Sequence, residues 1–153
     1  MPFANPTADP TFPFFYNVEK AVGKDGANQK EDVRLVQYMI KHLYKEKANT
    51  LAVDGFWGYH TAQWITRFQA DAKAGGMSIT TDGRVDRAMG TVSSVSKTTY
   101  TIVWLNVLLR KANPAAYAAL PSVVKLTPIQ NAGSPYSPYA WQQPGFIPES
   151  GGV

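Results

Sequence analysis

Aromatic, basic and histidine side chains gather between Trp57 and Arg67, just after an Asp-Gly dipeptide. Trp57 and Tyr59 follow the dipeptide closely, and His60, Trp64 and Arg67 recur at three- and four-residue spacing. Such spacing places side chains on one side of a helix. Aromatic faces suit the C–H surfaces of sugars, and Arg or His suits a carboxylate. These five residues predict a surface that binds a sugar or a short peptide.

A structural role for two of these aromatics is the alternative. Trp57 could close the end of a small helical bundle, and Trp64 could pack beneath another segment of the chain. The binding interpretation requires the surface beside residues 54–64 to be an open groove. In the packing interpretation, residues 1–24 or 121–153 cover that surface.

The residues needed for catalysis are few. The chain has no cysteine and only two histidines, His42 and His60, which excludes a thiolate nucleophile and leaves too few ligands for a His-rich zinc site. Motifs for a serine nucleophile elbow, a zinc protease helix or a phosphate-binding glycine loop do not occur. The carboxylates are compatible with turns and helix caps, and nothing favours a glycosidase pair. We predict a protein that is not an enzyme and uses no metal or cofactor.

A first helix is expected from about residue 29 to residue 47. Asn28 and Glu31 have the spacing of a capping box, which would start this helix. Its inner face follows an i, i+3, i+4, i+7 pattern: Val33, Val36, Gln37, Ile40, Leu43 and Tyr44. Leu35 and Met39 form a second apolar stripe on nearly the opposite side. That stripe predicts cover by the N-terminal or C-terminal segment.

A turn and a second helix follow. Asp54, Gly55 and Gly58 tolerate the backbone conformations of a sharp reversal, so residues 53–58 should form a rigid elbow between two elements. The helix after it has one inner face, made by Thr61, Ile65, Phe68, Gln69 and Ala72. It should end at residues 75–76, two glycines.

The rest of the central region contains a turn, a loop and one more helix. A second Asp-Gly pair, at residues 82–83, predicts a turn with at most one helical turn after it, and residues 91–99 are rich in Ser and Thr and predict a loop. Residues 100–111 predict a third helix that is apolar almost all round. Residues 114–120 predict a short alanine-rich helix.

The prolines are confined to the two ends of the chain. All 11 prolines lie outside residues 14–113, and proline disrupts a helix interior. We therefore predict an all-α fold, a small three-helix bundle over residues 25–113. An extended arm rich in proline and aromatic residues precedes it at residues 1–24, and a similar tail follows at 114–153. The aromatics of the tail predict packing on the chain's own domain or on a neighbour; a tail that is disordered in isolation is the alternative.

Charge and hydropathy limit the partners. The net charge is +4 and the sequence pI about 9.3, but the basic residues are dispersed, which argues against a nucleic-acid-binding stripe. No apolar run reaches the roughly 20 residues of a membrane span. The first residues have neither the basic nor the apolar region of a signal peptide. We expect a location in the cell envelope, outside the cell or on a particle. The protein would reach it with a leader that has since been removed, or by another route such as cell lysis or a particle that carries it.

The order of these features resembles the small three-helix type of peptidoglycan-binding domain. The matching series is Asp32-Val33, Leu35-Val36-Gln37 and Ile40; Leu51 to Gly58 with Thr61, Ile65 and Phe68-Gln69; and Asp82-Gly83-Arg84-Val85. In that family the third helix follows the second Asp-Gly closely, whereas here a Ser/Thr-rich insertion intervenes. Either residues 86–89 or residues 100–111 could form the third helix. The resemblance spans about residues 25–113.

The resemblance implies a structural motif and a binding function. The motif comprises Gln37, Asp54, Gly55, Gly58, Thr61, Phe68 and Gln69. The two glutamines sit on inner helical faces, where their amides can satisfy backbone groups of the elbow. The implied function is non-catalytic attachment to glycan or stem peptide of the bacterial cell wall. The alternative is a structural or assembly protein of a phage tail or phage-like secretion particle, in which the arms clasp protein partners or copies of the same chain.

Overall fold

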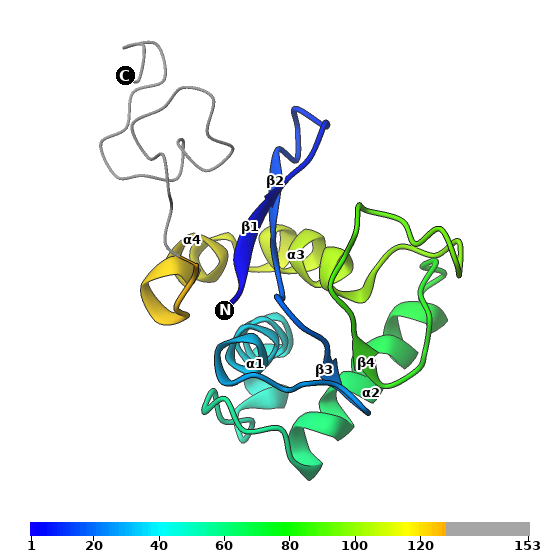
Figure 1. The fold of residues 1–153 in the computed structure, drawn as a ribbon. Coiled ribbons are helices and arrows are strands. Elements are labelled where there is room, and N and C mark those ends of the chain that lie inside the picture. Colours follow the sequence, from blue (N-terminus) through cyan, green and yellow to red (C-terminus); the bar gives the residue numbers. More distant parts are fainter. Residues whose placement is uncertain (128–153) are drawn as a thin grey trace, which may run out of the picture.

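The computed structural model describes residues 1–127 of the 153-residue chain. This part contains the helices α1 (Lys30–Tyr44), α2 (Tyr59–Ala74), α3 (Thr101–Ala112) and α4 (Pro114–Val123), and a short 3-10 helix, η1 (Lys45–Ala48). Its strands are β1 (Phe3–Pro6), β2 (Phe14–Asn17), β3 (Val22–Gly23) and β4 (Arg84–Val85). β1 pairs with β2 and β3 pairs with β4, both antiparallel (Figure 1).

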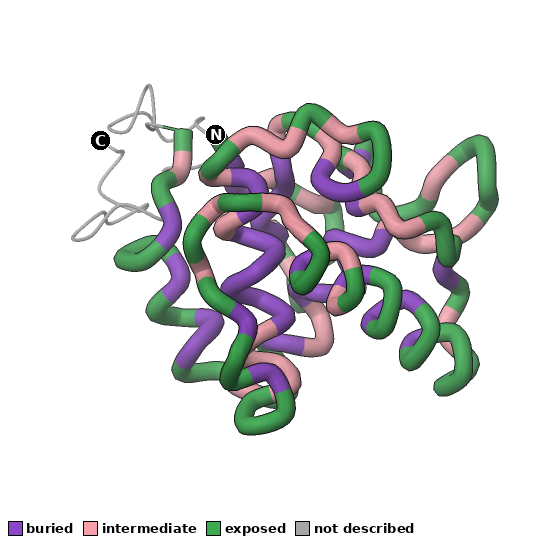
Figure 2. Tube along the Cα trace, turned by 90° about the horizontal axis from the view of Figure 1, so that it is seen from below, coloured by how far each residue is buried: buried purple, intermediate pink, exposed green. Residues whose placement is uncertain are grey.

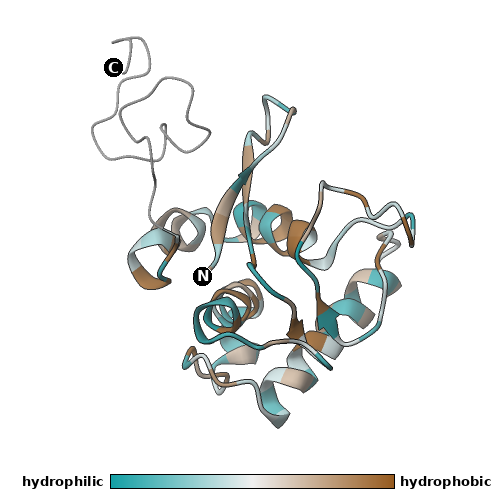
Figure 3. Ribbon diagram, viewed as in Figure 1, coloured by the Kyte–Doolittle hydropathy of each residue, from teal (hydrophilic) through white to brown (hydrophobic). Residues whose placement is uncertain are grey.

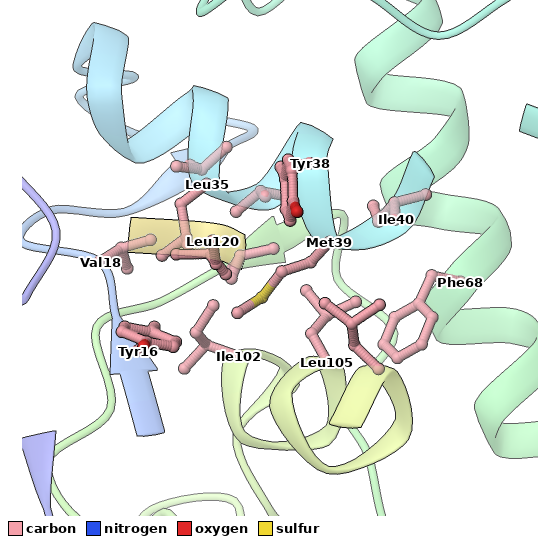
Figure 4. Packing of buried hydrophobic residues seen from close by; sticks show 14 of the residues in the cluster. Tyr16, Val18, Leu35, Tyr38, Met39, Ile40, Phe68, Ile102, Leu105 and Leu120 are labelled. Carbon is pink, nitrogen blue, oxygen red and sulfur yellow. The ribbon is translucent and has the colours of Figure 1, made fainter. Parts of the chain in front are cut away.

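Helix α1 lies at the centre of the fold and contacts each of the other three α-helices. Both of its apolar stripes are buried, so its middle is purple in Figure 2. The stripe that carries Leu35 and Met39 lies among Val18, Ile102 and Leu120 (Figure 4). Segments from the N-terminal region, α3 and α4 therefore cover the side of α1 that faces away from α2.

Helix α2 is buried along a single stripe. Its buried residues are Thr61, Ile65, Phe68, Gln69 and Ala72, and this confirms the inner face that the spacing predicts. Buried and exposed residues alternate along α2 in Figure 2, and hydrophilic residues interrupt hydrophobic ones in Figure 3. The opposite side of α2 is therefore available to solvent.

Gln37 of α1 holds the turn that precedes α2. Its Oε1 accepts hydrogen bonds from the backbone N–H groups of Asp54 (3.0 Å) and Gly55 (2.8 Å). Its Nε2 donates to Asp54 Oδ1, to the carbonyl of Phe56 and to Thr61 Oγ1, each at 3.0 Å. One buried amide thus satisfies a turn that has no strand partner. It also fixes the first turn of α2 through Thr61.

Gln69 of α2 repeats this arrangement at the second Asp-Gly turn. Its Oε1 accepts from the N–H of Gly83 at 2.8 Å. Its Nε2 donates to the carbonyl of Arg84 (2.8 Å), to Thr101 Oγ1 (3.1 Å) and to Asp82 Oδ1 (3.3 Å). The fold therefore contains an internal repeat, in which a glutamine on one helix holds an Asp-Gly turn and a threonine at the start of the next helix.

Gly55 is required in the first turn for two reasons. Its φ is +78°, in the left-handed region, and a Cβ there would lie 2.5 Å from Lys30 Cγ and 2.8 Å from the carbonyl oxygen of Lys30. The equivalent Gly83 has a φ of +74°, but its nearest neighbour would be Thr66 Oγ1 at 4.0 Å. The first turn is therefore packed against the start of α1, whereas the second has open space beside it.

The predicted all-α three-helix bundle with extended arms is wrong. Residues 1–127 contain four α-helices and two small antiparallel sheets, so the fold mixes helix and strand. In the N-terminal segment, Pro10 occupies the second position of a turn closed by the Phe12 N–H and the Asp9 carbonyl (3.0 Å). Proline is common at that position of a turn. Pro10 thus lies in the loop of a β-hairpin, and the segment is not an extended arm.

The hairpin is anchored by asparagine side chains. Asn106 of α3 accepts from the N–H of Tyr16 (2.8 Å) and donates to its carbonyl (2.9 Å), as a neighbouring strand would do. Asn17 makes the same pair of bonds to Ala88, at 3.1 Å and 2.9 Å. Phe15, with no exposed surface, belongs to the same hydrophobic core as α1 and α3. Residues 1–24 therefore pack on their own chain.

Other local predictions differ in detail. The predicted capping box does not form: the N-cap of α1 is Gln29, which makes no side-chain cap bond. The side chain of Asn28 instead binds the N–H and carbonyl of Gly23, and Glu31 accepts from Arg34. Helix α3 provides the third helix, and residues 86–89 are not helical. The predicted tail from residue 128 onward lies outside the described residues.

Replacing Gln37 with methionine should strongly destabilise the protein. The change keeps the side chain's length but leaves two backbone N–H groups and a carbonyl of the turn without their partner, and an unsatisfied buried group costs about 1–3 kcal/mol. We expect a loss of about 2–4 kcal/mol in the free energy of unfolding, measured by urea titration. Gln63→Met on the exposed face of α2 is the matched control, with an expected change within about 0.5 kcal/mol. Equal effects of the two changes would contradict this role.

Candidate functional site

Four of the five predicted binding residues, Tyr59, His60, Trp64 and Arg67, lie on α2. Tyr59 and Phe56 are each 72% exposed, although both are large aromatic residues. His60 and Arg67 are exposed and Trp64 is half-buried. We call Phe56, Tyr59, His60, Trp64 and Arg67 the aromatic face. Phe56 is the member that the sequence did not single out, because only the folded turn directs its ring outward, beside Gly58.

Arg67 is held against two aromatic rings. Its guanidinium carbon lies 4.9 Å from the ring centroid of Trp64 and 5.3 Å from that of Tyr44. The rings of Tyr44 and Trp64 meet edge to face, with centroids 5.0 Å apart. Cation–π contact of this kind orients a guanidinium without using up its N–H donors. Arg67 is thus positioned before any ligand arrives.

Asp71 completes this arrangement. Its Oδ2 accepts a 2.6 Å hydrogen bond from the Tyr44 hydroxyl and lies 3.5 Å from Arg67 Nε. Burial, followed by the bond to Asp71, raises the pKa of Tyr44 well above its usual value. The hydroxyl therefore stays protonated, and able to donate, to a higher pH than that of an ordinary tyrosine. Sequence spacing had assigned Tyr44 only to the inner face of α1, because its meeting with α2 depends on how the two helices pack.

Two hollows border the aromatic face, and Tyr59 lines both. The smaller, about 160 Å³, lies beside the first Asp-Gly turn, and Asp54, Phe56, His60 and Thr61 are among its lining residues. The larger, about 630 Å³, is a shallow depression over α2 lined by Tyr59, Ala62, Gln63, Trp64, Thr66, Arg67 and Ala70. The turn orients the carboxylate of Asp54, since Asp54 Oδ1 accepts from the Phe56 N–H at 2.9 Å. That bond is the main cause of a lowered pKa for Asp54.

Trp57 lies apart from the other predicted binding residues. It is half-buried against the hydrophobic core and lines neither of the two hollows. Within residues 1–127, its buried indole N–H has no hydrogen-bond acceptor. The geometry therefore favours the alternative interpretation of Trp57, which is a packing role.

The N-terminal segment does not cover the aromatic face. β2 packs against α3, and Phe14 and Tyr16 contact Tyr117 of α4. Figure 1 shows the β1–β2 hairpin above α3, away from the start of α2. Residues 121–127 end beside the N-terminus, where the Thr127 N–H donates to the Pro2 carbonyl at 2.7 Å. As far as residues 1–127 are concerned, the aromatic face is open.

The titratable residues offer little for metal chemistry. In the described part of the chain, no three His, Asp or Glu side chains come close enough together to hold a metal ion. His42 packs on Tyr38 of α1, with ring centroids 4.2 Å apart, whereas His60 lies against Tyr59 at the start of α2. None of the helices within residues 1–127 has the length and apolarity to cross a membrane.

Comparison with known proteins adds no relative. No protein-family model matches this chain, and neither does any curated protein or solved structure. The resemblance to peptidoglycan-binding domains therefore depends on the residue series alone.

His42 should make the stability depend on pH near neutrality. Burial, and secondly the charge of Lys41, lower its pKa below the usual 6.5. The unfolded chain then takes up the proton first, so the contribution to stability is complete above pH 6.5 and is lost as the pH falls toward the folded-state pKa. We expect a histidine NMR titration with a midpoint below 6.5, absent in His42→Gln. The variant should also show a weaker fall in unfolding midpoint between about pH 7 and pH 5.5. A midpoint at or above 6.5 would contradict the burial argument.

Proposed function

We propose that this protein is a non-catalytic binding module of the peptidoglycan-binding type, which attaches to the bacterial cell wall through its aromatic face. The observation that carries the proposal is an exposed aromatic surface beside a fixed guanidinium. Phe56 and Tyr59 keep most of their surface in solvent, although burying such rings would stabilise the fold. Exposed aromatic residues that gather at one place are typical of binding surfaces.

The chemistry of the aromatic face suits wall material in two ways. The rings of Tyr59 and Trp64 offer flat apolar surfaces to the C–H groups of a sugar. Arg67 lines the depression over α2 and uses its Nε toward Asp71, which leaves its terminal nitrogens to suit the carboxylate of a stem peptide. Glycan and peptide would thus be bound by neighbouring parts of one helix.

The internal repeat supports the same proposal from the scaffold. Gln37 and Gln69, with their Asp-Gly turns, belong to the residue series that resembles the peptidoglycan-binding family. Their hydrogen bonds fix the start of α2 and of α3. They point inward, and the aromatic face points outward. The scaffold can therefore hold the binding residues without contacting the ligand.

Insoluble cell wall should pull the protein out of solution. At low salt we expect most of the protein in the pellet, and Tyr59→Ala and Arg67→Gln should each weaken binding by about tenfold, as for residues at the centre of an interface. Met89→Ala is the matched control, because Met89 is 80% exposed and lies elsewhere. Thermal unfolding should be nearly unchanged in all three variants. Wild-type protein that stays in the supernatant would defeat the proposal.

A structural role in a phage tail or phage-like secretion particle is the second candidate. It is favoured by the loop after β4, where Met89, Val92 and Val95 are 80%, 53% and 91% exposed. Apolar residues at such positions suit contact with a protein partner or a second copy. The hairpin, however, uses the aromatics of residues 12–16 within its own chain.

Light scattering separates the two candidates. An assembly role predicts oligomers at micromolar concentration that Met89→Ser with Val92→Ser converts to monomers, because the change removes the apolar contact. Tyr59→Ala should leave those oligomers intact. A monomer in every form would count against assembly through this loop.

A further inference from the structure

The second Asp-Gly turn borders a hollow of its own. Its volume is about 340 Å³, against about 160 Å³ beside the first turn. Matching members of the internal repeat line the two hollows. Asp54 and Thr61 line the first, and Asp82 and Thr101 line the second. We call the hollow beside Asp82 the second-turn hollow.

The lining of the second-turn hollow is unlike that of the aromatic face. Its lining includes two acidic residues, Asp82 and Asp86, and two basic residues, Arg84 and Arg87. These charges balance, so neither an anion nor a cation is favoured by the local field. The other lining residues are mostly hydroxyl-bearing: Thr80, Ser93, Ser96, Thr98, Thr99, Tyr100 and Thr101. The hollow therefore offers many donors and acceptors without net charge.

Its polar groups are already held in place. Arg84 donates from Nε and Nη2 to Asp86 Oδ1 (3.1 and 2.9 Å) and from Nη1 to the carbonyl of Lys24 (3.1 Å). The hydroxyl of Thr98 lies 2.8 Å from that of Thr80 and 2.6 Å from that of Ser96. Hydroxyl groups linked in a chain can turn together to donate or accept. A ligand would meet a prepared surface with little further ordering.

We propose that the second-turn hollow is a separate binding site for an uncharged sugar unit of a glycan. A neutral polyhydroxylated ligand matches a neutral lining that is rich in hydrogen-bonding groups, and Tyr100 adds an aromatic side chain to that lining. The volume falls at the lower end of the range of about 300–1,000 Å³ for small-molecule sites. The choice of a wall glycan rests on the proposed function. The site extends it, because glycan would be held here as well as along α2.

An NMR titration with the neutral tetramer of N-acetylglucosamine tests this site in the full-length protein. We expect saturable shifts of backbone amides within residues 80–101. Thr98→Val and Ser96→Ala should each weaken binding roughly fivefold, since each removes one hydrogen-bonding hydroxyl. Thr91→Val is the matched control, because it makes the same change at an exposed threonine outside the hollow. It should bind as the wild type does. Well-dispersed spectra establish that each variant is folded.

Three outcomes would overturn the site. They are an absence of saturable shifts up to about 10 mM tetramer, shifts confined to the aromatic face, and equal affinities of Thr98→Val and Thr91→Val. Failure of the proposed function is seen separately, in wall sedimentation. If the protein binds the tetramer at residues 80–101 but does not sediment with wall, the site is supported and the wall is not its target.

Discussion

The fold depends on the need to satisfy the backbone of two tight Asp-Gly turns, at residues 54–55 and 82–83. A buried N–H or carbonyl without a partner costs about as much as a large share of a domain's net stability. Gln37 and Gln69 remove that cost with one side chain each, by binding the N–H of the glycine and the carbonyl of the residue after it. Because each amide also binds the threonine at the start of the next helix, the turn and the helix become one rigid unit.

Amides on shorter side chains extend the same principle to the N-terminal segment. Asn106 and Asn17 each bind both backbone groups of one residue, Tyr16 and Ala88 respectively. These contacts replace a neighbouring strand, so a two-stranded hairpin that would be marginal alone is stable against helices. The aromatic residues of the hairpin then complete the core around α1. A mostly helical scaffold can therefore include a two-stranded hairpin that is not part of a larger sheet.

Scaffold and candidate binding surface divide helix α2 between them. Its buried stripe carries Thr61 and Gln69, which connect the two turns, while its exposed side carries all of the aromatic face except Phe56. Rigid elements position binding residues most accurately. Here, residues of α2 line both hollows that border the aromatic face. The two halves of the repeat differ in the side chains that they expose. The first turn is followed by aromatic groups and the second by charged and hydroxyl groups.

The sequence alone determined the features that depend on neighbours along the chain. The extent of α2, its five buried positions and the Asp-Gly turns follow from helical periodicity and from the backbone freedom of glycine. Tertiary structure decided what depends on distant pairs. The bond from Asn106 to Tyr16 turns an expected extended arm into a hairpin, and helix packing brings Tyr44 to Arg67. Likewise, Trp57 turns inward and the second-turn hollow forms only when residues 80–101 fold together. Such contacts leave no periodic signal, because each is set by the packing of elements that are far apart in sequence.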